Sequence, residues 1–178
     1  MDVSVIIVNY NVEHFLSQCL LSVRAGVAVL EESGYAAEVF VVDNNSVDGS
    51  CAMVRRQFPE VHLIDSKENL GFSKGNNLAI RQSKGRWVLL LNPDTIIQED
   101  TLLKCLAYAD ARPRLGGLGV PMVDGAGRYL PESKRGTPTQ ALPSGRSQGC
   151  TTWPHALLGS TAITWGICQK MNPSPSKF

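Results

Sequence analysis

Short apolar runs alternate with helical patterns over the first 123 residues of the chain. Runs of Val, Ile, Leu and aromatic residues predict strands at residues 3–8, 39–42, 61–64, 87–91 and 118–123. Apolar residues at helical spacing predict helices over residues 13–30, 48–58, 73–82 and 99–111, with Ser73 as the cap of the third helix. Strands that alternate with helices favour parallel pairing through right-handed crossovers. The pattern therefore predicts an α/β fold, followed by a hairpin turn at residues 124–127.

The run from Leu89 to Leu91 ends abruptly at Asn92, Pro93 and Asp94. It does not alternate apolar with polar positions, which is typical of a strand covered on both faces. Ligands in such sheets bind outside the carboxyl ends of the strands, so Asp94 is expected at an active-site edge. A carboxylate there suits a hard divalent cation that holds a diphosphate. The alternative interpretation is a simple strand-ending turn.

Three further polar clusters fall at the same predicted edge. After the first strand, the ring of Tyr10 could stack on a base, although Asn9 to Asn11 also suits a turn and helix cap. Asp43 ends the second strand, where a carboxylate can accept a hydrogen bond from ribose or base. Asp48 lies near a helix start, where capping alone can explain it.

The cluster from Asn69 to Asn77 contains two glycines and a cation, and it precedes or opens a helix. Gly71, Lys74 and Asn76 would suit close approach to a diphosphate or a base, although a capped helix start is an equal alternative. The cluster is neither a dinucleotide fingerprint nor a P-loop. Since no glycine-rich turn follows the first strand, a dinucleotide oxidoreductase is disfavoured.

Together these motifs resemble the family 2 glycosyltransferases, particularly the rhamnosyltransferase-like bacterial branch. The motifs that carry the resemblance, in order, are Val3 to Asn11, Val42 to Gly49, Asn69 to Asn77 and Leu91 to Asp94. The resemblance implies a Rossmann-like GT-A nucleotide-diphospho-sugar transferase fold, with a mostly parallel sheet, helices on both faces and an incomplete C-terminal part. It also implies inverting transfer of a sugar, hexosyl or rhamnosyl, from a nucleoside-diphosphate sugar to a hydroxyl of a saccharide or lipid-linked acceptor.

The resemblance also assigns roles to residues. It implies that Asn9, Tyr10 and Asp43 form the nucleoside pocket, and that Asp94 is the ligand of Mg²⁺ or Mn²⁺. Asn92 replaces the first Asp of the DXD motif and is counted with the substrate-binding residues. The rim of the pocket would consist of Gly71, Lys74 and Asn76.

The character of the chain changes after the resemblance ends at residue 136. Residues 137–178 contain no Asp or Glu and half of the ten prolines, and they show no period of a helix or strand. We therefore expect a nucleotide-sugar-binding domain over residues 1–136 and an atypical tail, irregular or disordered, that is not its natural continuation. The family's catalytic base lies beyond the hairpin, so the base is unassigned here. A nucleotide-binding fragment that lacks the general base is the alternative function.

The net charge, the N-terminus and the cysteine count indicate where in the cell the protein works and which partners it lacks. The net charge of +1 supplies no general attraction for nucleic acid or an anionic membrane. The N-terminus has neither a basic segment nor an apolar run long enough for a signal peptide or membrane span. Five cysteines without a CxxC pair fit reduced thiols, and Cys19 and Cys105 are predicted helix core residues. We expect a cytoplasmic protein, with peripheral attachment to the inner membrane and homo-oligomerisation left open.

Overall fold

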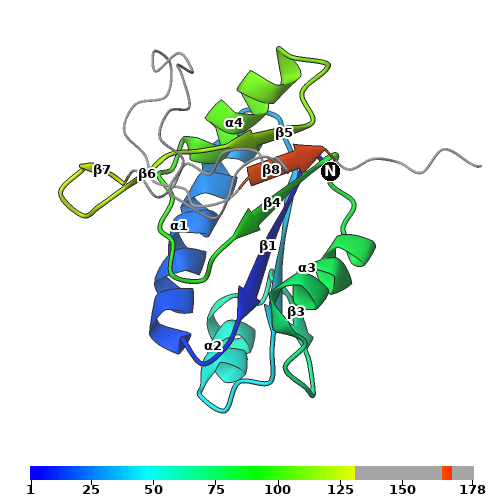
Figure 1. Ribbon diagram of the computed structural model, residues 1–178, viewed down its shortest axis with the longest axis vertical. Coiled ribbons are helices and arrows are strands. Elements are labelled where there is room, and N and C mark those ends of the chain that lie inside the picture. The colour runs from blue at the N-terminus through cyan, green and yellow to red at the C-terminus, as the bar shows by residue number, and fades with distance from the viewer. Residues whose placement is uncertain (131–165, 170–178) are drawn as a thin grey trace, which may run out of the picture.

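The computed structural model describes residues 1–130 and 166–169 (Figure 1). Its elements begin with four strands that alternate with four helices, and four short strands follow. In chain order the elements are β1 (Val3–Asn9), α1 (Glu13–Glu32), β2 (Ala37–Asp43), α2 (Ser50–Gln57), β3 (His62–Asp65), α3 (Gly71–Gln82), β4 (Trp87–Leu91), α4 (Thr101–Asp110), β5 (Gly117–Gly119), β6 (Met122–Val123), β7 (Tyr129–Leu130) and β8 (Gly166–Gln169).

The main sheet has the strand order β3-β2-β1-β4-β8-β5. The first four of these strands are parallel, and β1 lies between β2 and β4, with Val3 opposite both Ala37 and Trp87. In chain order, β2 and β3 are added to one side of β1, and β4 is then added to the other side. Between β1 and β4 the direction of building reverses, and open α/β sheets bind their ligands in the crevice at such a point.

Helices cover both faces of this sheet, which confirms the predicted α/β fold. In Figure 1, α3 lies on one side of β1 and β4, and α1 and α4 lie on the other. Successive residues of β1 point to opposite faces: Val5 and Ile7 pack in the larger core with α1, α2 and α4, whereas Ile6 packs in the smaller core with Ala79 of α3. Burial on both faces is why these strands show no polar alternation. Cys19 and Cys105 are buried in the larger core, as predicted.

Most predicted bounds agree with the structure to within two residues, and two elements differ in a way that changes the description. Helix α3 begins at Gly71, two residues before the predicted cap Ser73, and its N-cap residue is Leu70. The Asn69 side chain accepts a hydrogen bond from the Gly71 amide at 2.9 Å. The predicted strand at 118–123 is divided into β5 and β6, which belong to different sheets. The hairpin turn is confirmed, since β6 and β7 pair antiparallel around Asp124, whose carboxylate accepts bonds from the Ala126 and Arg128 amides.

Strand β8 lies within the segment that the sequence predicts to be irregular, so that prediction is wrong for residues 166–169. The strand pairs antiparallel with β4 on one side and with β5 on the other. Four residues are too few to show a period, and their pairing partners lie far away in the sequence, which explains why the pattern missed them. The rest of the predicted tail lies outside the described residues.

Candidate functional site

Two buried polar side chains meet where β1 and β2 end. Asn9 and Asp43 are paired in the strand register, and both are almost completely buried, with 0% and 1% of their surface exposed. The Asn9 amide nitrogen donates to one Asp43 carboxylate oxygen at 2.8 Å, and the Ser46 backbone amide donates to the other at 2.8 Å. The structure thus brings together two of the residues predicted for the nucleoside pocket, and it holds the Asp43 carboxylate from both sides.

The Ser46 hydroxyl ties the loop after β2 to the loop after β1. It accepts hydrogen bonds from the Asn9 side chain at 3.2 Å and from the Asn11 backbone amide at 2.9 Å. The Asn11 side chain in turn accepts a bond from the Val47 amide at 2.8 Å. Asn11 and Asn45 both have positive φ angles, 53° and 64°, which Asn tolerates better than most residues. Sequence reasoning missed Ser46 as the centre of this network.

Asp48 links the same two loops, and its hydrogen bonds are those of a helix cap. One carboxylate oxygen accepts the Ser50 amide at the start of α2, and the other accepts the Glu13 amide at the start of α1, each at 3.0 Å. Loss of water raises the pKa of Asp48, but these hydrogen bonds outweigh that effect, and the pKa lies below its ordinary value. The carboxylate therefore stabilises two helix starts and remains ionised.

The residues predicted for the rim of the pocket lie on the first turns of α3. Gly71 has a φ of 72° with open space beside it, and Lys74 is exposed. Asn76 is buried instead, and its amide donates to the Phe72 carbonyl at 2.9 Å. Gly75 lets α3 approach β1 closely, since a Cβ there would lie 3.2 Å from a Val8 methyl.

Two neighbouring side chains complete this end of the sheet. The ring of Tyr10 is 50% exposed just after β1 and is therefore accessible for stacking. Asn44 is buried, and its amide donates to the Gly71 carbonyl at 3.4 Å. Within the described part of the chain, the side-chain oxygens of Asn9 and Asn44 have no hydrogen-bond partner. The loops after β1 and β2 and the start of α3 therefore meet around these two asparagines.

Asp94 follows β4 on the other side of β1 and is exposed. A turn joins the Thr95 amide to the Asn92 carbonyl at 3.2 Å, and the Cys19 thiol lies 3.5 Å from that carbonyl oxygen. Burial and then the charge of Asp94 raise the pKa of the Cys19 thiol to about 12. Among residues 1–130, no ion pair involves the Asp94 carboxylate.

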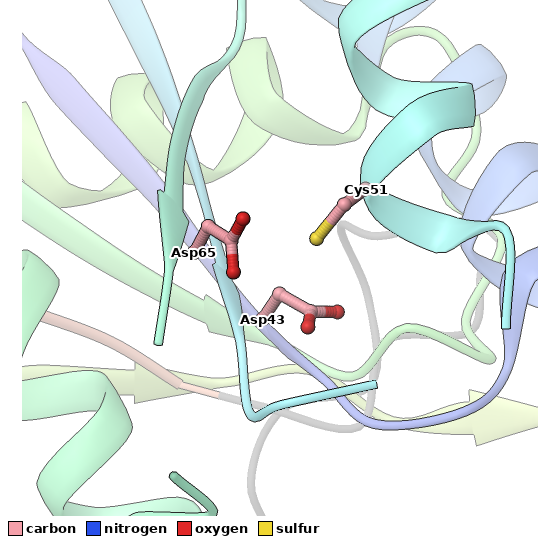
Figure 2. Close-up of side chains that lie close together, drawn as sticks. All are labelled: Asp43, Cys51 and Asp65. Carbon is pink, nitrogen blue, oxygen red and sulfur yellow. The ribbon is translucent and has the colours of Figure 1, made fainter. Parts of the chain in front are cut away.

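A second group of ligand-type atoms comes from Cys51, Asp65 and Asp43, the last of which is also predicted for the nucleoside pocket (Figure 2). Their donor atoms all lie within 4.8 Å of one another and come from β2, α2 and β3, so the group is a possible metal-binding triad. Asp65 is already paired with Arg55 at 2.8 Å and with Lys67 at 3.2 Å.

The thiol of this triad is held in its protonated form. Burial and the charges of Asp43 and Asp65 raise the pKa of Cys51 to about 11. A metal ion that bound here would have to displace the thiol proton, and Mg²⁺ and Mn²⁺ prefer oxygen donors. Sequence reasoning did not group these three residues, because they lie on three different elements.

Comparison with known proteins decides the family. The model of glycosyl transferase family 2 matches residues 4–167 of the chain. The chain belongs to glycosyl transferase family 2. The match confirms the resemblance found in the sequence motifs, and it extends 31 residues past the predicted domain boundary at residue 136.

One relative is the low-salt glycan biosynthesis hexosyltransferase Agl10 of Haloferax volcanii. It is 36% identical over 135 residues, and the match covers 68% of this chain and 39% of that protein. Staphylococcus aureus TarS, solved in complex with UDP, is 28% identical with a TM-score of 0.61, covering 78% of this chain and 38% of that one. The mannosyltransferase PcManGT of Pyrobaculum calidifontis, solved with GDP-Man and Mn²⁺, is 26% identical with a TM-score of 0.60, covering 68% and 35%.

These similarities confirm a family 2 fold, and each covers only part of a longer protein. The chain spans well under half the length of the relatives it matches, 39% in the case of Agl10. No helix within the described residues combines the length and apolar character that crossing a membrane requires.

Proposed function

We propose that this family 2 chain binds a nucleoside-diphosphate sugar where β1, β2 and β4 end, and transfers its sugar with inversion to a hydroxyl of a saccharide or lipid-linked acceptor. The observation that carries the proposal is the convergence of polar loops on one sheet edge. The bonded pair Asn9 and Asp43 lies on one side of that edge, and Asp94 lies on the other. The solved relatives with UDP and with GDP-Man and Mn²⁺ support a ligand of this class.

The nucleoside would lie against the loops after β1 and β2. The Asp43 carboxylate accepts hydrogen bonds from the Asn9 side chain and the Ser46 amide, and it is also hydrogen-bonded to the Cys51 thiol. A carboxylate offers about four acceptor sites, so one is left for a donor on a base or ribose. The exposed ring of Tyr10 offers an apolar face on which a base can stack. Gly71 leaves open space at the start of α3, and the exposed ammonium group of Lys74 can approach a diphosphate oxygen.

The Asp94 carboxylate fits Mg²⁺ or Mn²⁺, because it is an exposed hard oxygen donor without an ion-pair partner among the described residues. Such a cation would neutralise negative charge on the departing diphosphate. Asn92 supplies a neutral residue at the first position of the motif, so Asp94 is the carboxylate that this turn offers. The triad of Asp43, Cys51 and Asp65 suits this role less well, because Asp65 is paired with cations and Mg²⁺ and Mn²⁺ prefer oxygen donors to a thiol.

The acceptor's general base is not assigned to any described residue. The alternative, a nucleotide-binding fragment without transfer activity, is not favoured, since the family model continues through residue 167 rather than ending with the nucleotide-binding motifs. A cytoplasmic location with peripheral attachment to the inner membrane would suit a lipid-linked acceptor, and it belongs to the same proposal.

A thermal-shift panel tests the proposed donor class. UDP-, dTDP- and GDP-sugars are each added with Mn²⁺ and with EDTA, and we expect one nucleotide class to raise the melting temperature more strongly with Mn²⁺. Asp94→Ala should abolish the difference between Mn²⁺ and EDTA while leaving the metal-free shift in place. Equal stabilisation in Mn²⁺ and EDTA for every nucleotide would refute the metal-assisted proposal, and no stabilisation by any of them would refute the donor site.

A further inference from the structure

The segment that carries Asp94 has no regular secondary structure, and residues of α1 form hydrogen bonds with it both before and after Asp94. Between Leu91 at the end of β4 and Thr101 at the start of α4, the chain forms neither helix nor strand. Before Asp94, the buried Cys19 thiol donates to the Asn92 carbonyl at 3.5 Å. After Asp94, the Ile97 amide donates to the Ser22 hydroxyl at 3.1 Å.

The Ser22 hydroxyl is itself fixed in direction. It donates its proton to the Cys19 carbonyl of the same helix at 2.7 Å, so an oxygen lone pair faces the Ile97 amide. Ser22 therefore joins the backbone of α1 to the backbone of the Asp94 segment, whereas an alanine there would join neither. The residue lies one turn after Cys19, and the two anchors share one face of α1.

Packing reinforces these hydrogen bonds one turn further along α1. A Cβ at Gly26 would lie 3.3 Å from a methyl of Ile97 and 3.4 Å from a methyl of Leu102. Ile97 is buried, in contrast to its exposed neighbour Ile96. The Asp94 segment therefore packs on α1 through the buried Ile97 side chain and forms two hydrogen bonds with the helix.

We propose that Ser22, assisted by Cys19, is a positioning residue that holds Asp94 ready to bind the divalent cation. The inference rests on the proposed function, in which Asp94 is the metal ligand. A ligand on an irregular segment loses conformational freedom each time it binds, and prior fixation of the segment removes most of that cost. Ser22 does this through the backbone at Ile97 and does not itself contact the substrate or the cation.

The chain provides a matched control on the same helix. The Ser33 hydroxyl also donates to a carbonyl of α1, that of Val29 at 3.0 Å, but it lies at the far end of the helix and is exposed. Ser22→Ala and Ser33→Ala therefore remove the same group and the same type of intrahelical bond, and they differ in the contact with Ile97. Ser22→Thr keeps the hydroxyl and serves as the rescue variant.

The first measurement is the affinity for UDP by calorimetry, once with Mn²⁺ and once with EDTA; the nucleotide that the thermal-shift panel selects replaces UDP if it differs. We expect Ser22→Ala to reduce the gain in affinity that Mn²⁺ provides by about tenfold, the lower end of the usual effect of removing a group that orients a metal ligand. The affinity in EDTA should stay unchanged. Ser33→Ala and Ser22→Thr should both retain the gain of the parent protein.

The second measurement is backbone amide exchange without metal or nucleotide. Exchange at Ile97 and its neighbours should be faster in Ser22→Ala than in Ser33→Ala. If Asp94→Ala abolishes the Mn²⁺ effect but Ser22→Ala behaves like Ser33→Ala in both measurements, the positioning role is wrong and the proposed function stands. If the parent protein shows no Mn²⁺ effect, the proposed metal site is wrong, and the positioning role is refuted with it.

Discussion

A buried carboxylate at the opposite edge of the sheet offers a sharp test of the fold. Glu38 of β2 lies beside Ser4 of β1, and one of its oxygens accepts three hydrogen bonds. The donors are the Ser4 hydroxyl at 2.5 Å, the Lys84 amide at 2.5 Å and the Gly85 amide at 3.1 Å. This carboxylate thus joins β1, β2 and the turn that leads from α3 into β4.

The cost of Glu38→Ala follows from these contacts. The Gly85 amide keeps its second bond, to the Ser4 hydroxyl at 2.8 Å, whereas the Lys84 amide loses its acceptor. Hydrogen bonds to a charged group contribute about 1.5–3 kcal/mol each, and water can replace part of what is lost, so we expect destabilisation of about 3 kcal/mol. For a chain of this size, that corresponds to a melting temperature lower by roughly 6–12 °C.

The same carboxylate predicts a pH dependence. Burial raises the pKa of Glu38, but the bonds from Ser4, Lys84 and Gly85 outweigh burial, and the pKa lies below the ordinary value of 4.5. A lowered pKa in the folded state means that the ionised group stabilises the fold fully above pH 4.5, and that this stabilisation is lost as the pH falls through the folded-state pKa. Glu38→Gln keeps an acceptor oxygen but cannot titrate.

Urea unfolding at a series of pH values measures both effects. The parent protein should be more stable than Glu38→Gln at neutral pH, and the difference should shrink as the pH is lowered below 4.5. Glu60→Ala is the matched control, because Glu60 is exposed and forms a surface ion pair with Arg24, which is usually worth no more than about 1 kcal/mol. A loss in Glu38→Ala no larger than in Glu60→Ala, or a difference independent of pH, would refute this reasoning.

Two further predictions concern the nucleotide-binding edge. Asp43→Ala should weaken UDP binding by about 1.5–3 kcal/mol, the range for a hydrogen bond to a charged group, and should hardly change pyrophosphate binding. Calorimetry with both ligands checks this, and equal weakening would make Asp43 a structural residue. Gly75→Ala should destabilise the fold by roughly 1–3 kcal/mol in urea, because its new methyl group would press on Val8 and force α3 away from β1. Unchanged stability would show that α3 can shift at no cost.

The sequence predicted those elements whose structure is determined by residues close together in the chain. The apolar run before Asn92 gave β4 with its observed bounds, Trp87–Leu91, because a strand buried on both faces differs from its surroundings at every position. Parallel pairing then places the strand ends at one edge. For this reason Asn9 and Asp43, 34 residues apart, could be predicted to lie near each other, and they are hydrogen-bonded.

The sequence could not predict residues whose partners are set by tertiary packing. Glu38 is an isolated acid near the start of β2, and nothing near it in the chain indicates that its partners are Ser4 and the turn at Gly85. Ser22 is an ordinary polar position in an amphipathic helix, and its partner Ile97 lies 75 residues away. Single polar residues of this kind give no periodic signal, whatever their contribution to the fold or the site.

Helix α1 connects the loop of Asp48 with the segment of Asp94, the two parts of the proposed site. Its first residue, Glu13, is bonded through its amide to Asp48 of the nucleoside loops, and Ser22 holds the segment of Asp94. Nine residues of helix separate these two anchors, a rise of roughly 14 Å. Since a helix is stiff over this length, α1 fixes the separation of these two anchors, together with the direct pairing of β1 with β4. The motif residues Asn9, Asp43 and Asp94 end strands or follow them, whereas Ser22 lies in a helix without a recognisable motif.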